Sequence, residues 1–63
     1  MKPLSVSVSR EGNTWAAYTD LGELVETAPG RNSLMEALVW AARRRGCDAL
    51  QIDGGEFVPV SAA

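Results

Sequence analysis

The sequence contains no histidine and a single cysteine, Cys47, among its 63 residues. One thiol cannot close a disulfide within the chain, and without histidine a structural zinc site would need several carboxylate ligands. Nucleophilic catalysis needs a nucleophile with a base beside it, and Cys47 follows a predicted helix C-terminus, which is the end that does not activate a thiol. The sequence therefore predicts no catalytic residue, no metal site and no cofactor.

Excess positive charge and long apolar runs are also missing. The net charge is −2 with a pI near 4.8, whereas proteins that bind nucleic acid generally use a strongly basic face. No apolar run approaches the roughly 18 residues of a membrane span, and the alternating N-terminus does not resemble a secretion signal. Hydrophobic residues make up 46% of the chain, which is typical of a folded domain. We expect one small cytoplasmic α+β domain over residues 1–63, with a reduced thiol.

Alternating apolar and polar residues predict three strands in the first half of the chain. These are residues 4–9, 14–19 and 23–27, because side chains of a strand point to opposite faces in turn. Gly12 and Asn13 tolerate the positive φ of a tight hairpin between the first two strands. The three strands are therefore expected to form a meander.

A helix is expected to follow, from Ser33 to the residue before Gly46. Ser33 and Glu36 match the capping box, in which each side chain satisfies the other residue's free amide. Gly46 is expected to end the helix in the left-handed conformation. At about 100° per residue, one apolar stripe forms the core face; its members are Leu34, Leu38, Ala41 and Ala42.

The remaining segment predicts a fourth strand over residues 48–53 and a possible fifth over residues 56–60. A two-residue Gly-Gly hairpin between them would place Ile52 opposite Phe57. Pro59 would restrict the last strand to a sheet edge. The expected fold is thus α+β, in the order β-β-β-α-β with a possible fifth strand. One helix packs on one face of an antiparallel sheet.

The two faces of this sheet are expected to differ. Trp15 is interpreted as the main aromatic residue of the core, because its alternation partners Ala17 and Thr19 are small enough to let a helix approach. Tyr18 would then lie on the opposite face of the sheet. That face is expected to be flat and polar, and it also carries Ser5, Ser7 and Ser9.

The candidate binding site lies on the outer face of the helix. Helical periodicity places Trp40 opposite the core stripe, near Glu36, Arg43 and Arg44. Tryptophan is the residue type most enriched at binding hot spots, and Arg44, four residues on, can stack over the indole. We expect these residues to bind another protein by an aromatic anchor with arginines that pair to carboxylates at its rim.

Other interpretations of the helix remain open. Trp40 can be covered by the loop of residues 28–32 or by the C-terminal tail, or it can bury itself between two copies in a homodimer. The run Arg43 to Arg45 can contact nucleic acid, or part of it can be explained by the helix dipole alone, which favours positive charge in the last turn.

The order of strands and the helix start "SLMEAL" resemble the HicB-like antitoxin fold, in which a three-stranded meander leads into a helix that begins Ser/Thr-x-x-Glu-Ala. Ser33, Glu36 and Ala37 match this pattern, and "APGRN" stands where that family has a glycine-rich lead-in. The resemblance implies a protein that binds and neutralises a small toxin.

Two further resemblances rest on larger parts of the chain. The hairpin "GNTW", the helix start and the final "IDGG" are similar to a family of small bacterial β-β-β-α-β proteins of unassigned function. The meander and helix are also similar to the arm-binding domain of phage-type integrases, whose sheet reads DNA. Those sheets are rich in Lys and Arg, whereas this one offers mostly Ser, Thr and Glu.

Together these features favour a non-enzymatic protein-binding module, with Trp40, Arg43, Arg44 and Glu36 as its contact residues. Small acidic chains of this kind are common in phages and mobile elements, where they act as inhibitors or antitoxin-like proteins by steric occlusion of a partner. A nucleic-acid-binding domain that uses Arg43 to Arg45, or a structural homodimer, is the alternative.

Overall fold

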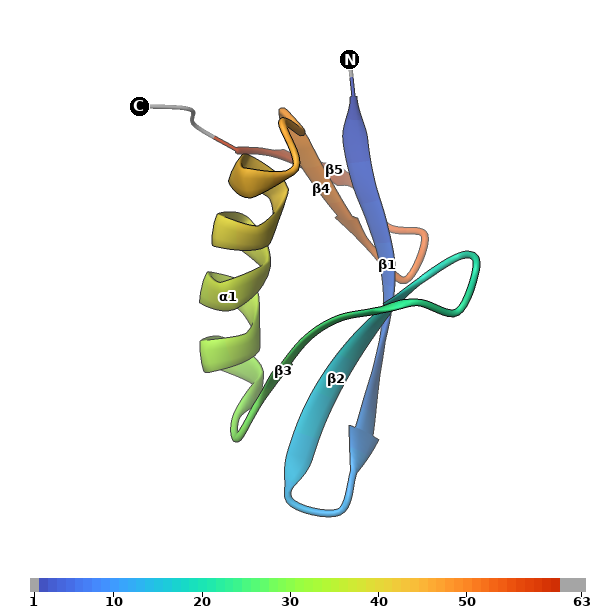
Figure 1. The fold of residues 1–63 in the computed structure, drawn as a ribbon, viewed down its shortest axis with the longest axis vertical. Coiled ribbons are helices and arrows are strands. Elements are labelled where there is room, and N and C mark those ends of the chain that lie inside the picture. Colours follow the sequence, from blue (N-terminus) through green and yellow to red (C-terminus); the bar gives the residue numbers. More distant parts are fainter. Residues whose placement is uncertain (1, 61–63) are drawn as a thin grey trace.

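A computed structural model describes residues 2–60 of the chain as one helix packed on one face of a sheet (Figure 1). This confirms the expected α+β class, the β-β-β-α-β order and the fifth strand. The elements, in chain order, are β1 (Pro3–Glu11), β2 (Thr14–Thr19), β3 (Leu24–Ala28), α1 (Arg31–Arg44), β4 (Ala49–Ile52) and β5 (Phe57–Pro59).

The sheet is mixed, which corrects the expectation that it is antiparallel throughout. Its strand order is β3-β2-β1-β4-β5, and β1 pairs with β4 in parallel, with Leu4 opposite Leu50 and Val6 opposite Ile52. The other three pairs are antiparallel. The parallel pair arises because α1 carries the chain from edge strand β3 back across the sheet to the far side of β1.

The hairpin between β4 and β5 differs from the expected one. Asp53 (φ 53°) and Gly54 (φ 73°) both adopt positive φ, and the N–H of Gly55 donates to the carbonyl of Ile52 at 3.0 Å. The turn therefore lies one residue earlier than a Gly-Gly hairpin, and one extra residue on the β5 side of the turn places Phe57 opposite Gln51 rather than opposite Ile52. Because side chains alternate, this shift turns Phe57 to the opposite face of the sheet.

The start of α1 also differs from the expected capping box. The helix begins at Arg31 with Gly30 as its N-cap, and no side chain makes a capping hydrogen bond. Ser33 is thus the third residue of the helix, and its hydroxyl makes no capping hydrogen bond. The signal was misleading because Ser-x-x-Glu also occurs within a helix, and Gly30 is itself a tolerated N-cap.

The end of α1 is as expected. Gly46 has a φ of 71° and donates its N–H to the carbonyl of Arg43 at 3.0 Å. The N–H of Cys47 donates to the carbonyl of Ala42 at 2.8 Å. These two bonds form a Schellman motif, which satisfies carbonyls that the helix end leaves free.

The hydrophobic core lies between α1 and the face of the sheet that carries Leu4, Val6 and Leu50. The predicted helical stripe is confirmed, because Leu34, Leu38, Ala41 and Ala42 are all buried. Trp15 is half-buried against this core, in agreement with its predicted side. Within residues 2–60, no helix is long and apolar enough to cross a membrane.

Candidate functional site

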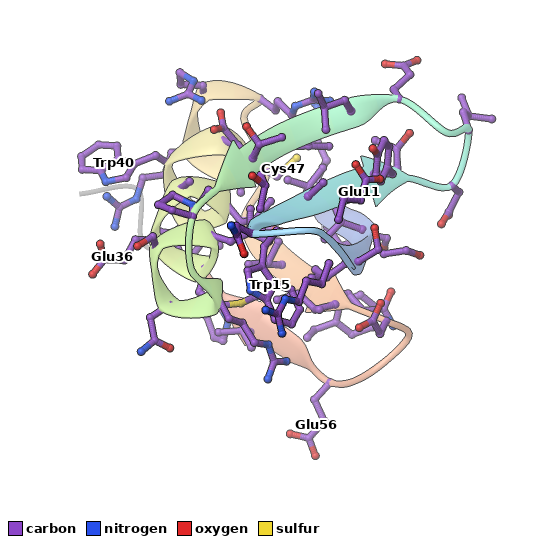
Figure 2. All side chains as sticks on the ribbon, turned by 90° about the horizontal axis from the view of Figure 1, so that it is seen from below. Glu11, Trp15, Glu36, Trp40, Cys47 and Glu56 are labelled. Atoms are coloured by element: carbon purple, nitrogen blue, oxygen red, sulfur yellow. The ribbon has the colours of Figure 1, made fainter. Side chains whose placement is uncertain are left out.

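Trp40 projects from the outer side of α1, away from the sheet, and 58% of its surface is exposed (Figure 2). Its helix neighbours Met35 and Val39 are half-buried against the core, so the indole extends beyond the packed part of the domain. The loop of residues 28–32 therefore leaves most of the ring in solvent. The alternative in which the C-terminal tail covers Trp40 concerns residues 61–63, which lie outside the described residues.

Arg43, not Arg44, stacks on the indole. The guanidinium carbon of Arg43 lies 4.8 Å from the centre of the Trp40 ring, a distance typical of a cation–π contact. The Nε of Arg43 is buried and has no hydrogen-bond partner within residues 2–60. The contact holds a flat cation against a flat aromatic ring, so the pair presents one amphipathic surface.

Arg44 has a different partner, which the sequence did not indicate. Its Nη2 lies 3.1 Å from Oε1 of Glu26 on β3, and the two side chains are 63% and 28% exposed. This ion pair directs Arg44 toward β3, whereas Arg43 covers the indole. Arg43 and Arg44 follow Trp40 by three and four residues, and both spacings bring side chains of a helix together. Helical periodicity alone therefore did not decide which arginine contacts the indole.

Glu36 is exposed on α1 one turn before Trp40, and both side chains point away from the sheet (Figure 2). No hydrogen bond or ion pair in the described part of the chain joins Glu36 to an arginine. The structure thus places Trp40 and Arg43 in contact and pairs Arg44 with Glu26 on β3. Glu36 is exposed beside them and contacts neither arginine through a hydrogen bond or ion pair in the described residues. We call Glu36, Trp40, Arg43 and Arg44 the Trp40 face.

Charge is divided unequally between the helix and the rest of the chain. Residues 31–45 contain four arginines and Glu36, which gives +3, whereas the whole chain carries −2. The remaining residues therefore carry −5, from two basic and seven acidic side chains. The Trp40 face itself carries +1, from Arg43, Arg44 and Glu36, and Arg44 is paired with Glu26.

The face of the sheet opposite α1 is the second exposed surface, which we call the open sheet face. As predicted, Tyr18 lies here and pairs across the strands with Ser7. Its hydroxyl donates a hydrogen bond to Oε1 of Glu11 at 3.1 Å. This bond, together with the negative charge of Glu11, raises the pKa of Tyr18 above its ordinary value.

A shallow hollow of about 350 Å³ lies at the β4–β5 end of the open sheet face. It is lined by Asp48, Ala49, Phe57 and Pro59. Phe57 is 45% exposed, and Oδ1 of Asp48 accepts the backbone N–H of Lys2 at 2.9 Å. The hollow is therefore mostly apolar, with one carboxylate among its lining residues. The sequence did not reveal it, because it depends on the register of the last hairpin.

Cys47 is half-buried, and its Sγ lies 4.0 Å from the carbonyl oxygen of Arg45. In residues 2–60, no group of three or more Cys, Asp and Glu side chains is arranged to hold a metal ion.

Comparison with known proteins found no matching protein-family model, no matching curated protein and no matching solved structure.

Proposed function

We propose that this chain is a non-enzymatic interaction module that binds another protein through the Trp40 face. The single observation that carries the proposal is the exposed Trp40 with the Arg43 guanidinium stacked 4.8 Å from its ring centre. A large aromatic residue and a planar cation that is already positioned lose little side-chain freedom on binding. Arginine and tryptophan are also the residue types that dominate binding energy at protein interfaces.

The mechanism we propose is steric. Trp40 enters an apolar pocket of the partner, and the free donors of Arg43 pair with a carboxylate at the pocket rim. The bound chain then covers contacts that the partner needs for its own activity, as in antitoxin-like or phage-encoded inhibitors.

A protein partner suits this face better than nucleic acid. Arg43 lies on the indole and Arg44 is paired with Glu26, so the arginine run does not form one line that faces a phosphate backbone. Successive helix residues also point about 100° apart, which separates Arg45 from its neighbours.

Affinity capture from the native host tests the proposal, with the wild type compared with Trp40→Ala and Arg43→Glu. Leu21→Ala is the matched control, because Leu21 is 87% exposed but lies on the β2–β3 turn. We expect a protein captured by the wild type and the control to be lost with both helix variants. Since Trp40 is mostly exposed, Trp40→Ala should keep the wild-type circular dichroism spectrum and melting temperature.

A salt titration of the captured complex separates the two classes of partner. A nucleic-acid partner weakens steeply with salt in proportion to the phosphates contacted, whereas an apolar anchor responds weakly. Capture that is unchanged in Trp40→Ala, or a steep salt dependence with bound nucleic acid, would contradict the proposal.

A further inference from the structure

The hollow on the open sheet face has the chemistry that an indole with an attached guanidinium requires. Ala49, Phe57 and Pro59 supply an apolar floor and walls, and Asp48 supplies a carboxylate. Aromatic rings pack well on proline and on other aromatic rings, and arginine pairs with carboxylates. The Trp40 face of this same chain presents these two groups together.

We propose that the hollow accepts Trp40 of a second copy of the chain, so that copies associate helix to sheet. This deepens the proposed function, on which it rests, because it names one partner of the Trp40 face. In the complex, the indole lies against Phe57 and Pro59, and Arg43 reaches Asp48.

Charge complementarity supports this arrangement. The helix segment of residues 31–45 carries +3 and the rest of the chain −5. By strand alternation, the only charged residue of β1 on the open sheet face is Glu11, and the two turns that border this face carry four further carboxylates. These are Asp20, Glu23, Asp53 and Glu56. A basic helix face and an acidic sheet face attract each other, whereas two like faces repel.

The β5 edge of the sheet offers a poor alternative route to association. The N–H of Val60 donates to the carbonyl of Asp48 at 2.9 Å, so by alternation the backbone groups of Phe57 and Pro59 point away from β4. Pro59 has no N–H, which leaves Phe57 as the one outward backbone donor of this three-residue strand. Proline at such a position is a known protection against edge pairing.

The experiment uses two variants that each lose one half of the contact. Trp40→Ala keeps the hollow and loses the anchor, and Phe57→Thr keeps the anchor and loses a wall of the hollow. Val58→Thr is the matched control, because Val58 lies on the same strand, is 53% exposed and points to the other side of the sheet. Sedimentation velocity over a series of protein concentrations gives the association state of each, and circular dichroism confirms that each is folded.

We expect the wild type and Val58→Thr to form oligomers whose size increases with protein concentration and does not stop at a dimer. A helix-to-sheet contact leaves one face of each kind free at the two ends. Trp40→Ala alone and Phe57→Thr alone should each self-associate at least roughly tenfold more weakly than the wild type, as expected for loss of an anchor residue. Their equimolar mixture should form a 1:1 complex and stop there, because only one intact anchor and one intact hollow can meet.

Three outcomes would overturn the inference. They are a wild type that stays monomeric at every concentration, a Phe57→Thr variant that associates like the wild type, and a mixture that gains no complex. A monomeric wild type that still captures a foreign protein through Trp40 overturns this inference alone. Self-association and capture that are both unchanged in Trp40→Ala overturn the proposed function as well.

Discussion

Tyr18 is the single tyrosine of the chain, and its hydroxyl donates to Glu11 across the open sheet face. The hydrogen bond, and after it the charge of Glu11, favours the neutral phenol and raises the pKa of Tyr18 above 10.0. We expect ultraviolet absorbance of tyrosinate to give a folded-state pKa above that value. Glu11→Gln, which keeps an acceptor but removes the charge, should lower the pKa in part, and Glu11→Ala should lower it further.

The same shift has a consequence for stability. Because folding raises the pKa, the folded chain holds the phenolic proton more tightly than the unfolded chain does. The contribution of the Tyr18–Glu11 hydrogen bond to the free energy of unfolding is fully present below the unfolded-state pKa of Tyr18. It is lost as the pH rises through the folded-state pKa. A Glu11→Ala variant whose tyrosine titrates like the wild type would contradict this account.

At the level of single residues, the sequence identified Trp40 and Arg43 but assigned the cation–π contact to Arg44. Both arginines lie within one turn of Trp40, and helical periodicity cannot separate them. Arg44 instead pairs with Glu26, a residue on β3 that is 18 positions away in the sequence. Local spacing on the helix does not reveal such a partner on another element.

The secondary-structure elements were largely predictable, because period two and period 3.6 are read directly from apolar residues. The parallel pairing of β1 with β4 was not, since a strand alternates in the same way in parallel and antiparallel pairs. The register of Phe57 was missed for a related reason. Asp53 adopts a positive φ of 53°, so the turn lies at Asp53 and Gly54, and one extra residue separates it from the pairing of Phe57 with Gln51. The Gly-Gly sequence indicated neither feature.

The start of α1 gives a prediction at the scale of the element. Ser33 makes no capping hydrogen bond, so Ser33→Ala should change the free energy of unfolding by less than about 0.5 kcal/mol, whereas loss of a working cap costs about 1 kcal/mol. Gly30→Asp should instead stabilise the chain by a few tenths of a kcal/mol. The first turn holds no acidic residue, and a carboxylate at the N-cap accepts free amides and complements the helix dipole.

Urea denaturation of both variants beside the wild type measures these differences. A Cβ at Gly30 would lie 3.9 Å from Oγ of Ser33, which is an ordinary contact, so the substitution fits the backbone. A loss of about 1 kcal/mol in Ser33→Ala would restore the capping box as the true start of the helix.

Over the whole molecule, the least local feature is the pairing of β1 with β4, which joins the two ends of the chain at the centre of the sheet. Asp53 connects β1 and β4 by two hydrogen bonds directly after β4 ends. Its N–H donates to the carbonyl of Val6 at 2.9 Å, and its Oδ1 accepts the N–H of Val8 at 3.0 Å. The side chain thus replaces the partner that the Val8 amide loses once β4 turns away.

Asp53→Ala should therefore destabilise the fold by about 1–3 kcal/mol, because it removes the acceptor of a strand amide and places alanine at positive φ. Asp53→Asn keeps a side-chain oxygen and tolerates this backbone conformation, so it should stay close to the wild type. Amide hydrogen exchange gives the sharper readout: the Val8 amide should exchange faster in Asp53→Ala, while the amide of Tyr18 on β2 follows global stability. Equal protection of Val8 in the alanine variant and the wild type would show that the carboxylate does not hold the centre of the sheet together.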